Sequence, residues 1–202
     1  MSEALIVIDV QNDFCPGGAL GVEGGDQIVP ILNRLQERFE TIVLTQDWHP
    51  ADHRSFASQH QAEPFSTTMM PYGEQVLWPD HCVQGSEGAA FHPALDTDRA
   101  QLVIRKGFRS SIDSYSAFFE NDRSTVTGLA GYLRERGIER IALAGIATDF
   151  CVAYSALDAV KLGFKVRVVE DASRAIDLDG SLAAQMKEMR GAGVTITTSD
   201  TL

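Results

Sequence analysis

Short apolar runs alternate along the chain with segments whose apolar residues recur at helical spacing. The apolar runs are rich in Val, Ile and Leu, which is typical of strands buried on both faces of a sheet. The predicted strands are residues 4–10, 41–45, 102–105, 141–144, 165–169 and 194–197. The predicted helices are residues 26–39, 114–119, 125–136, 151–162 and 182–190. This alternation predicts an α/β fold with three α/β/α layers around a six-stranded, mainly parallel sheet.

The composition fits one domain and excludes several classes of partner. Of the 202 residues, 44% are hydrophobic and 22% charged, so we expect a single domain with a sizeable core over residues 1–202. The net charge of −11 argues against nucleic acids and anionic membranes as partners, because both bind basic surfaces. No apolar run has transmembrane length and no basic segment precedes the first strand, so we expect no signal peptide. Three widely spaced cysteines favour free thiols in a reducing cytoplasm.

Four predicted strands deliver a reactive or ligating side chain near their carboxyl ends. Asp9 and Asp47 lie at the ends of the first two strands, Lys106 follows the third, and Cys151 follows the fourth. The carboxyl ends of parallel strands share one edge of the sheet, where ligands bind in such folds. We therefore expect these four side chains to converge, although Asp9 alone would also fit a strand-end cap.

The segment around Cys151 predicts a strand, a tight turn at Gly145 and a helix. Thr148 and Asp149 are N-cap residue types, so Cys151 falls in the first helical turn, where the helix dipole favours a thiolate with a lowered pKa. With Asp9 as proton acceptor and Lys106 stabilising the anions, the thiol would be a nucleophile for acyl transfer through a thioester. The backbone N–H groups of the turn would face the oxyanion. The alternative is a small apolar Cys151 that fills space between helix and sheet.

A second set of residues predicts a metal site. Asp47 and His49 form an Asp-x-His pair at a strand end, and His81 from the long segment 47–100 completes a set of three ligands with open positions. His53 is either a fourth ligand or a residue that lines the site. No role is assigned to His60 or His92, and Cys15 and Cys82 are expected to pack in the core. Phe14, in a polar Gly-rich loop, is expected to cover the core, with ligand contact as the alternative.

Six blocks of sequence together resemble the nicotinamidases, within the isochorismatase-like cysteine hydrolase superfamily. The blocks follow in order over essentially the whole chain. They are IVIDVQNDFCPGGAL (6–20), TQDWHPADHRSFAS (45–58), WPDHCVQGSEGA (78–89), RKGF (105–108), SYSAF (114–118) and GIATDFCV (145–152).

The resemblance implies a role for each candidate residue. Asp9, Lys106 and Cys151 match the catalytic triad of the family. The metal ligands would be Asp47, His49 and His81, and the ion would be Zn²⁺, with Fe²⁺ or Mn²⁺ as alternatives. The resemblance also implies residues that contact the substrate, namely Phe14, Trp78, Tyr115 and Ile146.

The same resemblance implies a cis peptide bond between Ile146 and Ala147. The N–H groups of Ala147 and Cys151 would then form the oxyanion hole. The implied reaction is the hydrolysis of nicotinamide to nicotinate and ammonia in NAD salvage, with pyrazinamide as a further substrate. The loop 59–75 varies most among members, and whether the protein is a monomer or a homo-oligomer stays open.

Three alternatives remain. Isochorismatases do not use a nucleophilic cysteine, and N-carbamoyl amidohydrolases lack the metal cluster, so the presence of both Cys151 and the Asp47-His49-His81 set disfavours each of these enzymes. A doubly wound phospho-receiver module also places Asp and Lys at strand ends and binds a divalent ion. Such a module would need a second carboxylate beside the phospho-acceptor, and it would be much shorter than this chain.

Overall fold

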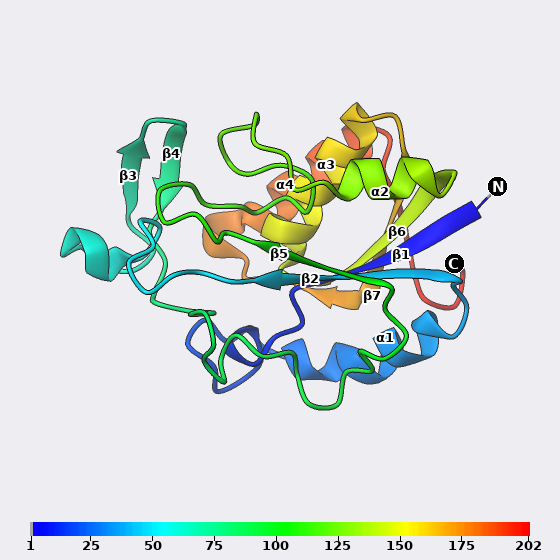
Figure 1. The fold of residues 1–202 in the computed structure, drawn as a ribbon, viewed down its shortest axis with the longest axis horizontal. Coiled ribbons are helices and arrows are strands. Elements are labelled where there is room, and N and C mark those ends of the chain that lie inside the picture. Colours follow the sequence, from blue (N-terminus) through cyan, green and yellow to red (C-terminus); the bar gives the residue numbers. More distant parts are fainter. Residues whose placement is uncertain (1) are drawn as a thin grey trace.

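A six-stranded sheet forms the centre of the protein. The computed structural model describes residues 2–202. The strand order is β5-β2-β1-β6-β7-β8, and every neighbouring pair is parallel, which confirms the predicted sheet (Figure 1). The strands are β1 (Ser2–Ile8), β2 (Thr41–Asp47), β5 (Leu102–Lys106), β6 (Ile138–Ile146), β7 (Lys165–Arg174) and β8 (Thr195–Thr197).

Helices cover both faces of this sheet. In Figure 1, α1 (Val29–Gln36) lies on one face, and the other face carries α2 (Leu129–Glu135), α3 (Ala153–Lys161) and α4 (Ser181–Gly191). The three predicted layers are therefore present. None of the helices within residues 2–202 is long and apolar enough to cross a bilayer. The assignment of the chain to a single domain stays a prediction.

Two adjacent strands, β1 and β6, form the centre of the core. Ala4 to Ile8 of β1 and Ile141 to Ile146 of β6 are fully buried or nearly so. Because both strands have a neighbour on each side and a helical layer on each face, their apolar runs are continuous rather than alternating. The parallel register of this pair, with Ile6 opposite Leu143, aligns their carboxyl ends.

Several predicted boundaries are wrong, for local reasons. The helix expected over residues 26–39 is shorter, because Gly25–Ile28 forms a 3-10 turn before α1. Pro30 then falls in the first turn of α1, where its missing N–H costs nothing. Residues 114–119 form no helix, and the helix expected from residue 125 begins only at Leu129.

The sequence pattern also missed a β-hairpin in the long segment 47–100. Strands β3 (Thr67–Met70) and β4 (Gly73–Val76) pair antiparallel, and Figure 1 shows them standing away from the main sheet, on the side opposite the two termini. Each strand has only four residues and few apolar side chains, so neither produced a periodic signal. The hairpin nevertheless contributes a buried side chain near the active site, as described below.

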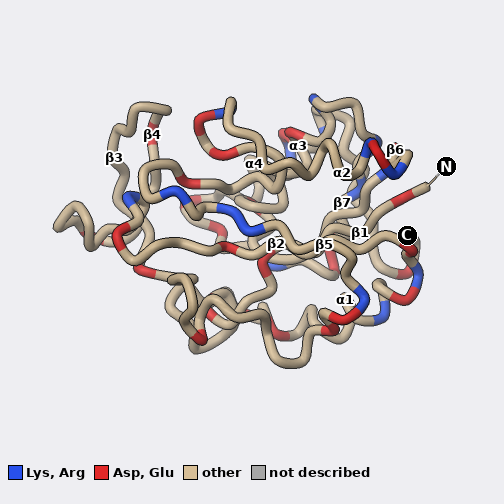
Figure 2. Tube along the Cα trace, in the orientation of Figure 1, with Lys and Arg blue, Asp and Glu red and all other residues tan. Residues whose placement is uncertain are grey.

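Charged residues are distributed along the whole trace. Figure 2 shows short Lys and Arg segments interspersed with Asp and Glu segments, which are more numerous, as the net charge of −11 requires.

Strand β6 continues through Gly145, where the sequence predicted a break. Gly145 has φ +132°, and a Cβ atom built on it would lie 2.1 Å from the carbonyl oxygen of Ile8 in β1. The absence of a side chain therefore allows β1 and β6 to approach each other at the ends that carry Asp9 and the turn to Cys151. Only glycine fits both this conformation and this spacing.

Gly145→Ala should lower the free energy of unfolding by more than about 3 kcal/mol, since the new methyl group would collide with backbone at a φ that L-residues rarely adopt. Chemical denaturation measures the change. Gly131→Ala is the matched control, because Gly131 lies in α2 with no atom within 4 Å of an added Cβ. That control should raise stability by about 0.5–1 kcal/mol. Equal effects of the two substitutions would contradict the proposed role of Gly145.

Candidate active site

The four predicted strand-end residues converge at one edge of the sheet. Lys106 and Asp47 are the last residues of β5 and β2, Asp9 directly follows β1, and Cys151 follows the turn after β6. These four strands are consecutive in the sheet order. Lys106 lies between the other three residues: its Nζ is 2.8 Å from Asp9 Oδ2 and 3.5 Å from Cys151 Sγ, and it donates a hydrogen bond to Asp47 Oδ1.

The Lys106 ammonium has four neighbouring groups, all from the protein. Its fourth neighbour is the backbone oxygen of Ser114, 2.9 Å away. Burial alone would lower the pKa of Lys106, but the carboxylates of Asp47 and Asp9 raise it well above its ordinary value. The side chain therefore stays charged, and its positive charge keeps two buried carboxylates close together.

Asp9 is oriented by its neighbour Thr45 on β2. Thr45 Oγ1 donates a hydrogen bond to Asp9 Oδ1 (2.6 Å) and accepts one from the backbone N–H of Asp9 (3.1 Å). Asp9 Oδ2 forms an ion pair with Lys106 and accepts no other hydrogen bond among residues 2–202, so it keeps a lone pair that can take a proton. Burial raises the pKa of Asp9 to about 6, although Lys106 opposes the rise. At neutral pH this carboxyl is mostly ionised. Its raised pKa makes the carboxylate a stronger proton acceptor than an ordinary Asp, which suits a general base.

Cys151 lies in a π-helical turn, Thr148–Val152, rather than in the first turn of an α-helix. This turn precedes α3 and is closed by a hydrogen bond from Val152 N–H to the oxygen of Ala147. Neither Thr148 nor Asp149 caps a helix, contrary to expectation. The Asp149 carboxylate instead accepts hydrogen bonds from Ile176 N–H and Asp177 N–H, before α4, and from the hydroxyl of Ser181, the first residue of α4.

The pKa of Cys151 is raised, whereas the sequence predicted that it would be lowered. Burial raises it well above the ordinary value, Lys106 opposes this, and the charges of Asp9 and Asp47 add to the rise. Burial is therefore the main reason why the pKa of this thiol is raised rather than lowered. One atom each of Asp9, Asp47 and Cys151 lie within 4.8 Å of one another. The resting pair is thus a Cys151 thiol beside an ionised Asp9, and the thiol requires a base to become a nucleophile.

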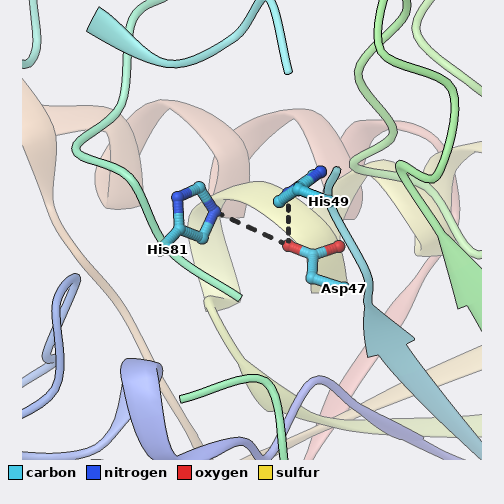
Figure 3. Close-up of side chains that lie close together, drawn as sticks. All are labelled: Asp47, His49 and His81. Atoms are coloured by element: carbon cyan, nitrogen blue, oxygen red, sulfur yellow. Dashed lines mark ion pairs between the residues drawn. The ribbon is translucent and has the colours of Figure 1, made fainter. Parts of the chain in front are cut away.

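Asp47, His49 and His81 form a compact set of possible metal ligands. Both imidazole rings direct Nε2 toward the same carboxylate oxygen of Asp47 (Figure 3), at 3.6 Å for His49 and 3.9 Å for His81. All three residues are buried, and one ligand atom from each lies within 4.8 Å of the others. Two imidazoles and a carboxylate are a donor set suited to a divalent transition metal.

The contacts around the two imidazole rings fit this role. The Nδ1 atoms are hydrogen-bonded to backbone oxygens, His49 to Gly107 (2.9 Å) and His81 to Pro79 (2.8 Å). A backbone oxygen only accepts, so each Nδ1 carries the hydrogen and each Nε2 offers a lone pair in the neutral ring. The His49 ring lies directly over Gly107, where a Cβ atom would come within 2.3 Å of it.

Charge interactions set the protonation of this set. Burial lowers the pKa of His81 to about 4, so its ring is neutral at pH 7. Burial also lowers the pKa of His49, but the hydrogen bond and charge of Asp47 raise it overall. For Asp47, burial favours a higher pKa, yet the Lys106 ammonium holds it well below the usual range. Asp47 is thus ionised and shared between Lys106 and the two histidines.

His53 lies beside this set. Its ring centroid is 4.3 Å from that of His49, but its Nδ1 is hydrogen-bonded to Ser55 Oγ (2.7 Å) and its Nε2 to the oxygen of Ile112 (3.2 Å). Both ring nitrogens therefore already have protein partners. In this arrangement His53 supports the His49 ring and does not point at Asp47 and His81.

A cavity lies between Cys151 and two of the candidate metal ligands. Asp47, His81 and Cys151 line it, together with the oxyanion-hole candidate Ala147. Its aromatic wall includes the three predicted residues Phe14, Trp78 and Tyr115, and Phe14 thus both covers the core and faces the cavity. The lining residues that sequence reasoning missed are Leu20, Asp113, Phe150 and Ile176. Of these, Phe150 is next to Cys151 in the sequence and Asp113 lies two residues before Tyr115.

Ile146 does not line this cavity. Its side chain is fully buried and its Cδ1 atom would lie 3.1 Å from a Cβ built on Gly25. Its position at the end of β6 turns the side chain into the core, and the substrate contact of Ile146 stays a prediction. The peptide bond between Ile146 and Ala147 is cis, as the resemblance implies.

The remaining cysteines have the expected packing positions. Cys15 and Cys82 are both buried and unpaired. Burial raises the pKa of Cys15 to about 11 and that of Cys82 well above its ordinary value, so neither is a ready nucleophile.

Comparisons with known proteins agree with this geometry. The isochorismatase domain family model matches residues 3–201. A nicotinamidase of Acinetobacter baylyi is 60% identical over 192 residues, covering 95% of this chain and 90% of that protein. A nicotinamidase of Escherichia coli is 46% identical over 200 residues, covering 96% and 94%.

Solved structures show the same relationship. A nicotinamidase and pyrazinamidase of Acinetobacter baumanii superposes with a TM-score of 0.97 at 56% identity, covering 98% of this chain and 97% of that one. A pyrazinamidase of Pyrococcus horikoshii in complex with zinc gives a TM-score of 0.79 at 36% identity, covering 98% and 99%. These matches exclude the phospho-receiver alternative. The chain belongs to the isochorismatase family, within its nicotinamidase group, and is an amidohydrolase.

Proposed function

We propose that this enzyme hydrolyses nicotinamide to nicotinate and ammonia through a thioester on Cys151. The observation that carries the proposal is the position of Lys106 Nζ, 2.8 Å from Asp9 Oδ2 and 3.5 Å from Cys151 Sγ, together with a cavity that Cys151, Asp47 and His81 all line. The substrate class comes from the relatives named nicotinamidase.

The first half of the reaction forms the thioester. Asp9 Oδ2 takes the proton from Cys151 Sγ, and the sulfur attacks the carboxamide carbon of the substrate. The negative charge that develops on the carboxamide oxygen is stabilised by the N–H groups of Ala147 and Cys151. Asp9 then returns the proton to the leaving nitrogen, the C–N bond breaks and ammonia departs.

The second half releases the acid. Asp9 takes a proton from a water molecule, whose oxygen attacks the thioester carbon. The C–S bond breaks, the proton on Asp9 returns to the Cys151 sulfur, and the product leaves as the carboxylic acid, which loses its proton to water and becomes nicotinate. Lys106 stays charged throughout and compensates the negative charge as it moves between Asp9 and Cys151.

Asp47, His49 and His81 are the residues that would hold a divalent metal ion. When bound, the ion would take the pyridine nitrogen at an open position and orient the ring over Cys151. Zinc fits the donor set, with iron or manganese as alternatives, and the zinc-bound pyrazinamidase from Pyrococcus horikoshii supports this choice. The aromatic side chains of Phe14, Trp78 and Tyr115 would enclose the ring.

The substrate range and the cellular role follow from the same chemistry. Pyrazinamide keeps both the carboxamide and a ring nitrogen in the same relative position, so we propose that it is also deamidated. Nicotinamide hydrolysis would place the enzyme in NAD salvage, in the cytoplasm, where free thiols persist.

Cys151→Ala should abolish ammonia release from nicotinamide, because it removes the thiol on which the thioester forms. The variant should still bind nicotinamide, measured by calorimetric titration, since the aromatic wall and the metal ligands are intact. Cys15→Ala is the matched control and should keep normal turnover, because Cys15 lies in the core. Ammonia release at the normal rate by Cys151→Ala would rule out the covalent route.

The pKa of about 6 for Asp9 predicts the acid limb of the pH profile. The base must be ionised, so kcat/KM should fall about tenfold for each pH unit below 6 and level off above it. Steady-state rates of ammonia release at a series of pH values measure this limb. Asp9→Asn should lose activity by about 10³-fold or more, with no such limb in the residual rate. An unchanged acid limb in that variant would remove Asp9 from the proton path.

His81→Ala should reduce the bound metal and the activity in parallel, because it removes one of three ligands. Elemental analysis of the purified variant gives the metal content and an ammonia assay gives the rate. His60→Ala is the control, since His60 bonds to the oxygen of Arg54, outside the cavity, and should keep both properties. Full activity of a metal-free His81→Ala protein would show that the metal plays no part in turnover.

A further inference from the structure

A buried glutamine from the β3–β4 hairpin lies at the centre of a polar cluster behind the aromatic wall. Gln75 is 1% exposed, although its strand neighbour Glu74 is exposed. Its Nε2 lies 2.8 Å from Asp113 Oδ2, 2.9 Å from the Tyr115 hydroxyl oxygen and 2.8 Å from the oxygen of Val76. The hairpin thus sends one amide group into the active-site region.

The orientation of this amide is determined by its neighbours. The carboxylate of Asp113 and the carbonyl of Val76 can only accept hydrogen bonds, so the amide nitrogen must face them. The amide oxygen of Gln75 then accepts hydrogen bonds from the Tyr72 hydroxyl and from Asn121 Nδ2, both at 3.2 Å. Every polar atom of the Gln75 side chain is therefore used.

Three acceptors share the two hydrogens of the Gln75 amide nitrogen, and two of them, Asp113 and Tyr115, line the cavity. Asp113 Oδ1 accepts from the N–H of Ser114 (2.8 Å), whereas Oδ2 is held by Gln75. The hydroxyl oxygen of Tyr115 accepts from Gln75 and from Trp78 Nε1 (3.1 Å). Gln75 thereby links the hairpin to a carboxylate and to two rings of the pocket wall.

Local backbone structure does not fix Tyr115. The described residues 107–128 contain no helix and no strand of either sheet. Tyr115 is positioned by side chains, because its N–H donates to Asn121 Oδ1 (3.0 Å) and its ring contacts Trp78 and Phe150 edge-on. Removing the Gln75 amide would remove one of two donors to the Tyr115 hydroxyl and the donor that holds Asp113 Oδ2.

We propose that Gln75 is a positioning residue that sets substrate affinity by holding Tyr115 and Asp113 in place at the wall of the cavity. None of its hydrogen bonds goes to Asp9, Lys106 or Cys151, so it acts on binding of the aromatic ring and not on the thioester chemistry. This inference rests on the proposed function, because it takes nicotinamide as the occupant of the cavity.

Gln75→Met tests the proposal, since methionine has a similar length and no amide. KM for nicotinamide should rise about tenfold, while kcat stays within about threefold of the wild type, as expected when binding contacts alone are lost. Gln75→Asn keeps the site polar but shortens the side chain by one methylene. This variant should also raise KM. Glu74→Met introduces the same side chain on the exposed face of the strand and should leave both constants unchanged.

A double-mutant cycle distinguishes positioning from a general loss of structure. Tyr115→Phe removes only the hydroxyl. If Gln75 acts through that hydroxyl, the combined Gln75→Met and Tyr115→Phe variant should have a KM within about twofold of the single variant with the higher KM. Multiplicative effects on KM would mean that Gln75 does not act through Tyr115 and would overturn the proposal. The proposal is also overturned if both Gln75 variants keep the wild-type KM, or if these variants lower kcat and leave KM unchanged.

The wild-type enzyme in the same assay separates the two hypotheses. If it releases no ammonia from nicotinamide, the proposed function fails and this inference fails with it. If it turns over nicotinamide and the Gln75 variants match Glu74→Met, only the role of Gln75 is overturned.

Discussion

A buried ammonium group shared by two carboxylates is the interaction on which the rest of the site depends. Asp9 and Asp47 come from different strands and are both buried, and neither charge would be tolerated without a partner. Lys106 supplies that partner for both and also binds the backbone of Ser114. One side chain therefore joins the proposed proton acceptor Asp9, the candidate metal ligand Asp47 and the irregular segment that carries Tyr115. Replacing it would leave two unpaired carboxylates beside a thiol.

The central sheet and the convergence of its strand ends were predictable from the sequence. The continuous apolar runs of β1, β2 and β6 are typical of strands buried on both faces, and parallel strands place their carboxyl ends together by geometry alone. For that reason the positions of four residues near the ends of predicted strands were sufficient to group them correctly. These residues are Asp9, Asp47, Lys106 and Cys151. The residues of the aromatic wall came from the resemblance, because a lone Phe or Tyr in a loop carries no directional information.

Features that depend on long-range partners were not predictable. Asp149 has the residue type of a helix cap, but its carboxylate is used by the segment before α4 and by the first residue of α4, far away in the sequence. The Cys151 pKa rises because the thiol is buried and two carboxylates from other strands lie nearby, which local helix geometry does not reveal. Gln75 belongs to a short, mostly polar hairpin, and only the folded chain shows that its amide meets Tyr115 and Asp113.

The last residue of β5 and the one after it serve different halves of the site. Lys106 contacts Asp9 and Cys151, and the carbonyl of Gly107 holds the ring of His49. Strand β5 is at the edge of the sheet and pairs only with β2. A slip of this pairing by one residue would turn the lysine to the opposite face and displace the glycine from beneath the imidazole in the same step. The proposed proton transfer and the proposed metal coordination therefore both depend on the position of one strand, and a shift of that strand would change both.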